Sequence, residues 1–161
     1  MSRPVRVVMS IATLYVSWMA MMAIHESGHV LAALAGGGHV RRVVLPLADF
    51  SRTDVDPNPS PRLEVWGGPL WGSLIPLFGW LLLRSKLSDR FKVPVGFFTG
   101  LCLVANGAYL GMGWTMSAGD AAELIKLGTP VWLLTAFGLT AIALGLYIWH
   151  TLGRVEDIFR A

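Results

Sequence analysis

The chain has 161 residues, of which 54% are hydrophobic and only 14% charged, with a formal net charge of +3. Soluble domains carry about 25% charged residues, so this composition argues against an ordinary soluble domain and indicates one membrane domain over residues 1–161. The 13 Lys and Arg stand in short clusters between apolar runs. This arrangement is typical of anchoring at a membrane interface, so we expect no nucleic-acid partner.

Four apolar segments are long enough to cross a membrane as helices, which takes about 20 residues each. They cover residues 7–35, 65–83, 93–116 and 130–149. The first segment is longer than the apolar part of a signal peptide and no small-residue cleavage site follows it, so we expect it to be retained. The predicted fold class is an all-α integral membrane protein with about four transmembrane helices.

The main polar segment lies between the first two predicted spans. Residues 40–45 are rich in β-branched side chains and predict a short strand or hairpin, whereas the proline-rich residues 54–61 predict a turn. A second polar segment follows the third span. There Asp120 and Glu123 have the spacing of a helix N-cap and its capping box, which predicts a short helix over residues 120–127.

The first predicted span contains the sequence His25-Glu26-Ser27-Gly28-His29. Residues four apart lie on one face of a helix, so the two imidazoles can bind one Zn²⁺. Glu26 then projects beside the metal, where it can act as the general base on a zinc-bound water. Because a charged side chain deep in a bilayer costs at least about 2.5 kcal/mol, this group needs a polar partner. The alternative is a polar cluster that only holds the helices together.

His-Glu-x-Gly-His in an apolar helix resembles the motif of the site-2 protease family of intramembrane zinc metalloproteases. Gly68-Pro69 is similar to the family's Gly-Pro signature, although Gly72 stands where members commonly have Asn. Asp120 stands in the place of the family's ligand aspartate, with Ala121 in place of the usual glycine. Its setting resembles the short branch of the family that lacks a PDZ domain. The resemblance implies that Asp120 is the third zinc ligand.

The expected topology also bears on the third ligand. Catalytic zinc typically has three protein ligands, and in a chain of four spans the loops after the first and third spans meet at the membrane face nearer to His25 and His29. Asp120 is on that face, and Asp89 is on the opposite one. A plain N-cap role is the alternative for Asp120. Other carboxylates on the same face stay open as ligands: Asp49, Asp54, Asp56, Glu64 and Glu123.

Three residues are candidates for substrate binding. Asn106, in the third predicted span, can bind the substrate backbone or the oxyanion, although we favour a plain interhelical hydrogen bond. The pair Gly68-Pro69 can break the second helix near the site or simply begin that helix. Gly28 stands between the two histidines, and its small size predicts either a close approach of two helices or an opening for the substrate.

The predicted function is an intramembrane zinc metalloendopeptidase that hydrolyses peptide bonds in or near the transmembrane segment of a membrane-protein substrate. An inactive membrane chaperone or adaptor of the same fold is the alternative. Metal transport is disfavoured, because transport needs polar residues along a path through the membrane and here they cluster at one level. We expect a multi-pass protein of the plasma membrane, surrounded by the lipid bilayer.

The positive residues bear on orientation. Eight lie at the predicted N-terminal face: Arg3, Arg6, Arg84, Lys86, Arg90, Lys92, Arg154 and Arg160. Five lie at the opposite face: Arg41, Arg42, Arg52, Arg62 and Lys126. This difference mildly favours a cytoplasmic N-terminus with the site outside. The family resemblance implies a site near the cytoplasmic face, and we follow the resemblance.

Overall fold

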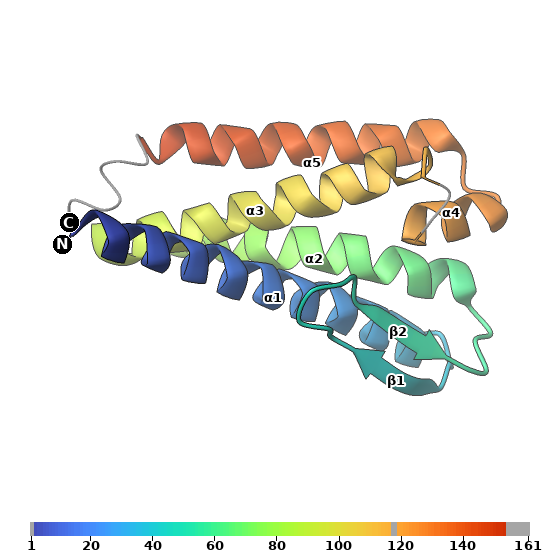
Figure 1. The fold of residues 1–161 in the computed structure, drawn as a ribbon. Helices are drawn as coiled ribbons and strands as arrows, with labels where there is room; N and C mark the ends of the chain where they lie inside the picture. The colour runs from blue at the N-terminus through green and yellow to red at the C-terminus, as the bar shows by residue number, and fades with distance from the viewer. Residues whose placement is uncertain (1, 117–118, 154–161) are drawn as a thin grey trace.

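The structure, a computed structural model, describes residues 2–116 and 119–153 and is mostly helical (Figure 1). Its elements in chain order are α1 (Arg3–Ala35), β1 (Val40–Val44), β2 (Arg52–Val55), α2 (Pro61–Leu83), α3 (Asp89–Gly113), α4 (Gly119–Lys126) and α5 (Val131–Thr151). Within the described ranges, α1, α2, α3 and α5 are long and apolar enough to cross a membrane. The predicted helices and the predicted hairpin are therefore confirmed. Arg154 and Arg160 lie outside the described residues.

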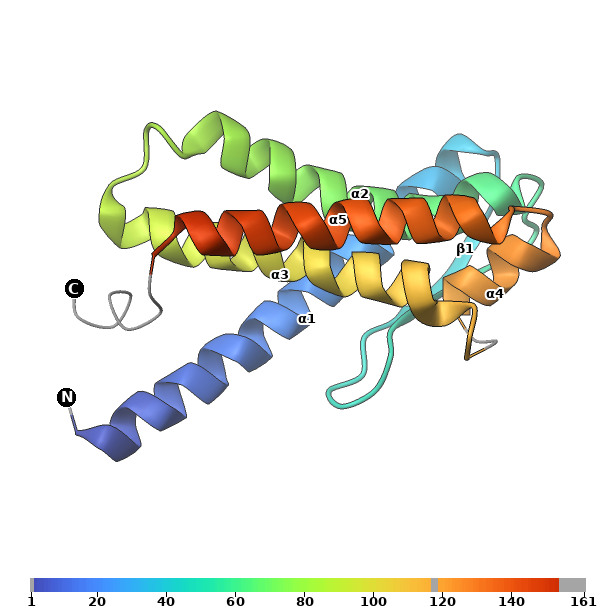
Figure 2. The same ribbon diagram turned by 90° about the horizontal axis from the view of Figure 1, so that it is seen from above.

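The long helices alternate in direction, and α1 packs mainly on α2 while α3 packs mainly on α5 (Figure 1). The hairpin and α4 lie together at the end of the bundle opposite to the N-terminus, as the topology predicts. The N-terminal half of α1 diverges from the other helices (Figure 2). It exposes apolar side chains such as Val8, Ile11 and Val16, and a lipid-facing helix needs a surface of this kind.

Glycines bring the helices into close contact. A Cβ atom added to Gly28 would lie 2.3 Å from the main-chain oxygen of Gly67, so α1 and α2 can cross only because both residues are small. On the other side of the bundle, a Cβ added to Gly138 of α5 would lie 2.6 Å from the Cα of Gly111 in α3. Small residues at such crossings are the usual means of helix association in membranes. The close approach predicted at Gly28 is confirmed.

Helix α2 differs from its prediction. It begins at Pro61, and Gly68-Pro69 lies inside it, so this pair neither breaks nor begins the helix. A second proline, Pro76, also lies inside α2. Proline removes one hydrogen bond of the helix, and neighbouring helices compensate for such losses in membrane proteins. In this helix the two prolines therefore do not mark a boundary.

Strands β1 and β2 form an antiparallel hairpin in which Val43 is paired with Thr53. Asp54 belongs to β2 rather than to the predicted turn, and its carboxylate lies 2.8 Å from the guanidinium of Arg42. The Arg42 guanidinium lowers the pKa of that carboxyl. The loop between the strands runs back along α1, where the Tyr15 hydroxyl donates to the main-chain oxygen of Leu47 (3.1 Å). The hairpin is thereby held over the buried half of α1.

The short helix α4 is the predicted one, and Gly128 follows its end with a φ of 84°. Asp120 lies in the first turn of α4 rather than at the predicted N-cap position. Leu124 and Ala121 of α4 are buried against the bundle in a cluster that also contains Leu110. This packing fixes α4 beside α3 and directs the carboxylate of Asp120 inward.

Candidate metal centre

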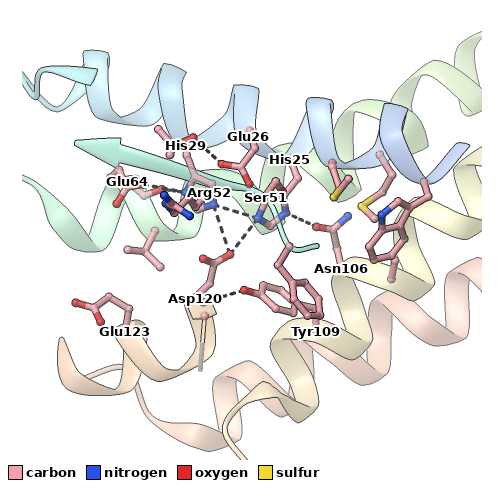
Figure 3. Close-up of a pocket in the computed structure, with 18 residues that line it drawn as sticks. His25, Glu26, His29, Ser51, Arg52, Glu64, Asn106, Tyr109, Asp120 and Glu123 are labelled. Carbon is pink, nitrogen blue, oxygen red and sulfur yellow. Dashed lines mark hydrogen bonds and ion pairs between the residues drawn. The ribbon is translucent and has the colours of Figure 1, made fainter. Parts of the chain in front are cut away.

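His25, His29 and Asp120 meet in a partly buried cluster at the hairpin end of the bundle (Figure 3). The Nε2 atoms of the two histidines lie 3.0 Å apart. The Oδ2 atom of Asp120 lies 3.1 Å from Nε2 of His25 and 3.5 Å from Nε2 of His29. These three residues could hold a metal ion, as the sequence predicts for the two histidines and the topology for Asp120.

The other ring nitrogen of His25 is occupied by Asn106. Nδ1 of His25 lies 2.6 Å from Oδ1 of Asn106. The amide nitrogen of Asn106 donates to the main-chain oxygen of Cys102 (2.8 Å), which turns Oδ1 toward the histidine. Since Oδ1 can only accept, Nδ1 of His25 carries the proton. In the neutral ring, Nε2 is the nitrogen that offers a lone pair to a metal.

Glu64 plays the same part for His29. Nδ1 of His29 lies 3.0 Å from Oε1 of Glu64 and also 3.0 Å from its main-chain oxygen. The main-chain oxygen can only accept, so Nδ1 of His29 carries a proton, and in the neutral ring Nε2 is the nitrogen that offers a lone pair to a metal. Metal-bound histidines almost always donate their second nitrogen to such an acceptor. Glu64 was open as a third ligand, and the structure places it behind His29 instead.

The lone pairs make a metal ion a good occupant of this cluster. The two Nε2 atoms and a carboxylate oxygen face one another at 3.0 to 3.5 Å. Without a metal, lone pairs on both Nε2 atoms beside an ionised carboxylate would repel one another, so a proton on at least one Nε2 atom must then join the three groups by hydrogen bonds. A cation turns all three contacts into ligand bonds. The residues present therefore fit a metal, by the chemistry of the donor set.

Asp120 is kept ionised by its neighbours. Burial acts to raise the pKa of Asp120, but hydrogen bonding and charge interaction with His25 and His29 outweigh burial and lower the pKa to about 2. The main-chain nitrogen of Asp120 also donates to the Tyr109 hydroxyl (3.4 Å). An ionised carboxylate is the form that binds a metal.

The remaining carboxylates that were open as ligands are not grouped with the two histidines, although Glu123 also lines the cavity. Asp54 and Asp56 are paired with arginines across the hairpin, and Asp49 is exposed. Glu123 lies on α4, where it is paired with Lys126 at 3.0 Å. Among the described residues, Asp120 is the carboxylate grouped with both histidines.

Glu26 is buried beside the cluster with only 2% of its surface exposed. Its Oε2 atom accepts a hydrogen bond from the hydroxyl of Thr53 in β2 (2.6 Å). Since Glu26 and His25 are adjacent in α1, the carboxylate lines the same cavity as the three clustered residues. The hairpin therefore reaches the residue that the sequence predicts as the general base.

The cavity has a volume of about 570 Å³, and both apolar and charged side chains line it. Trp18, Met21 and Met22 of α1 belong to the apolar part of the lining. Glu26 and Asp120 belong to the charged part (Figure 3). The ring of Phe50 from the hairpin also lines the cavity, and it stacks on Tyr109 with centroids 6.1 Å apart. A large apolar group could thus lie in the same cavity as the polar cluster.

The predicted substrate-binding residues lie close to the histidines. A Cβ atom added to Gly68 would lie 2.2 Å from Nε2 of His29, so the bare backbone of α2 makes room for this ring. Pro69 is fully buried next to it. Asn106 orients His25 through its hydrogen bond. A Cβ atom added to Gly72 would lie 2.8 Å from Oδ1 of Asn106. The interhelical hydrogen bond favoured for Asn106 is confirmed, and substrate binding by these residues stays a prediction.

Sequence reasoning missed the contacts of Thr53, Phe50 and Tyr109. Thr53 and Phe50 belong to the hairpin, whose place over α1 follows from long-range packing and has no periodic signal in the sequence. Tyr109 follows Asn106 by three residues in α3, a spacing that puts both side chains on one face of the helix. That spacing was the available sign that Tyr109 shares the cavity.

Comparison of the chain with protein-family models, with curated proteins and with solved structures finds no significant match. What the chain binds or catalyses is therefore inferred from its own side chains. The buried grouping of His25, His29 and Asp120, with Glu26 beside it, is the feature from which that inference begins.

Proposed function

We propose that the chain is an intramembrane zinc metalloendopeptidase, related in its motifs to the site-2 protease family. The observation that carries the proposal is the convergence of Nε2 of His25, Nε2 of His29 and Oδ2 of Asp120 within 3.0 to 3.5 Å of one another. Glu26 lines the same cavity, as a general base must.

The donor set favours zinc over other common ions. Mg²⁺ and Ca²⁺ prefer oxygen ligands, whereas two imidazoles and one carboxylate are a typical set for catalytic zinc. Ligands at about 2.0–2.1 Å in a tetrahedral arrangement lie about 3.3 Å from one another. The observed separations of 3.0, 3.1 and 3.5 Å are close to this value. Three protein ligands also leave one position for water or substrate.

The residues have distinct parts in the proposed hydrolysis. When bound, zinc acts as a Lewis acid and lowers the pKa of a coordinated water molecule toward about 7. Glu26 accepts the proton of the attacking water and passes it to the nitrogen of the leaving amine. Asn106 and Glu64 hold the two histidines in the tautomer that keeps Nε2 free. Asp120 supplies the third, anionic ligand.

The four long apolar helices support a multi-pass position in a membrane, which we place in the plasma membrane. The cluster lies in the half of α1 near the hairpin, and apolar side chains surround the other half. A substrate that reaches the cavity is then a membrane-spanning segment. It must unwind locally, because helical peptide bonds are shielded by their own hydrogen bonds. The apolar side chains that line the cavity suit a large apolar side chain of the substrate.

The proposal is tested with purified protein in lipid vesicles that also contain a model transmembrane peptide. We expect zinc-dependent cleavage, detected by mass spectrometry, by the wild-type protein and by Asp56→Asn, which changes an exposed carboxylate on the hairpin. Glu26→Gln should retain zinc and lose at least about a hundredfold in rate, as for loss of a general base. Cleavage by Glu26→Gln at the wild-type rate would reject the mechanism. An inactive adaptor of the same fold would bind the peptide without cleaving it.

A further inference from the structure

The hydroxyl of Thr53 and the carboxylate of Glu26 form a short contact between two parts of the chain 27 residues apart. The Oγ1 to Oε2 distance is 2.6 Å, which is the range of a hydrogen bond to an ionised oxygen. Glu26 is buried, and Thr53 is partly buried in the middle of β2. Loss of this bond would leave a buried carboxylate oxygen without its partner.

Thr53 is itself held firmly from several sides. Its strand is paired with β1 at Val43, and the loop before it is tied to α1 through Tyr15 and Leu47. Phe50, three residues earlier, stacks on Tyr109 of α3. The hydroxyl therefore approaches Glu26 from a fixed direction rather than from a flexible loop.

A general base needs one carboxylate oxygen in a fixed place. The side chain of glutamate has three rotatable bonds, so an untethered carboxylate spends little time in any one orientation. A hydrogen bond to Oε2 stops this rotation and leaves Oε1 to receive the proton. Geometry of this kind acts on the rate because a misplaced catalytic group loses most of its effect.

We propose that Thr53 is the positioning residue of the general base, and that β2 is therefore part of the catalytic machinery. The inference rests on the proposed function of Glu26. Thr53 does not touch the reacting atoms in this role, since it acts through the carboxylate. Movement of the hairpin away from α1 would release Glu26 and lower activity without disturbing His25, His29 or Asp120.

Two substitutions at this position separate the hydroxyl from the rest of the side chain. Thr53→Val keeps the β-branched shape that suits a strand and removes the hydroxyl. Thr53→Ser keeps the hydroxyl and removes the methyl group. Acetohydroxamate is the probe, because a hydroxamic acid that binds zinc gives up a proton to the neighbouring base. The dissociation constants of zinc and of acetohydroxamate are measured by calorimetry for the wild type, both variants and Glu26→Gln.

We expect Thr53→Val to weaken acetohydroxamate binding about tenfold, as for loss of a hydrogen bond to a charged group, with zinc affinity unchanged. Thr53→Ser should bind the probe within about threefold of the wild type, since the same hydrogen bond is retained. Equal probe affinity in Thr53→Val and the wild type would overturn the inference. So would an equal loss in both variants, which would assign the effect to shape, or a loss of zinc in Thr53→Val.

Failure of the proposed function gives a different pattern. Zinc-loaded wild-type protein would then not bind acetohydroxamate, or Glu26→Gln would bind it as tightly as the wild type. Either result overturns the role of Glu26 and this inference with it. Binding by the wild type, weak binding by Glu26→Gln and unchanged binding by Thr53→Val would leave the role of Glu26 intact and overturn only that of Thr53.

Discussion

The Nε2 atoms of His25 and His29 lie 3.0 Å apart, and each ring turns its Nδ1 atom to an acceptor on a different helix. Asn106 of α3 accepts the hydrogen bond from His25, and Glu64 of α2 accepts the one from His29. Helical spacing alone brings the two side chains to one face of α1, but it does not decide which nitrogens meet. Both neighbouring helices are needed to point two lone pairs at the same place.

Removal of the anionic ligand should weaken metal binding. We expect Asp120→Ala to lower zinc affinity by at least about a hundredfold, since a site with two ligands in place of three is incomplete. Glu123→Ala is the matched control, because this residue lies in the same helix and is paired with Lys126. Competition with a fluorescent zinc chelator measures both. Equal affinities in the two variants would remove Asp120 from the site.

A single methyl group in α2 should disturb His29. The Cβ of Gly68→Ala would stand 2.2 Å from Nε2 of this histidine, so the ring must move. Displacement of a ligand by this amount should reduce zinc affinity about tenfold to a hundredfold, as for the loss of its orienting partner. Gly79→Ala in the same helix meets nothing within 4 Å and should bind zinc normally. Normal binding by Gly68→Ala would show that His29 is not a ligand.

For zinc affinity, the side-chain oxygen of Asn106 that faces His25 should matter more than the amide nitrogen of Asn106. Asn106→Leu removes the oxygen that faces Nδ1, and we expect about a tenfold loss of zinc affinity. Asn106→Asp keeps an acceptor at this place and should retain zinc within a few-fold of the wild type. Calorimetric titration with zinc separates the two. If both variants lose zinc equally, the amide has a part other than orienting His25.

The contact between α3 and α5 should depend on the small size of Gly138. Its added Cβ would lie 2.6 Å from the Cα of Gly111, a backbone atom that cannot turn away. We expect Gly138→Leu to destabilise the folded chain by at least about 1–3 kcal/mol through overpacking. Thermal unfolding in detergent provides the measurement. The control is Gly79→Leu, whose side chain points into open space, and similar melting temperatures would contradict the tight crossing.

Local patterns predicted the parts of the site that depend on a single helix. His25, Glu26 and His29 stand in one apolar segment, and the fixed rise and turn of a helix determine their relation. The prediction that Asp120 is the third ligand was less direct, because it came from the alternation of spans and from a family resemblance. The first needs only the order of elements along the chain and the second only short motifs, and the structure groups these residues together.

Features that depend on contacts between distant segments were not predictable in the same way. The bond from Thr53 to Glu26 requires the hairpin to fold back over α1, and no period in the sequence specifies that placement. Glu64 was considered as a ligand because the sequence shows its charge but not which nitrogen of His29 it approaches. Pro69 was expected at a helix boundary, whereas packing within the bundle tolerates it inside α2.

The central claim is that His25, His29 and Asp120 together hold one zinc ion. Zinc K-edge X-ray absorption of the purified chain tests it directly, together with elemental analysis. The predicted result is one zinc per chain with two imidazole nitrogens and a carboxylate oxygen at about 2.0–2.2 Å, unchanged in Glu26→Gln and altered in Asp120→Ala. Protein that binds no zinc, or a zinc spectrum that is identical in Asp120→Ala, would contradict it.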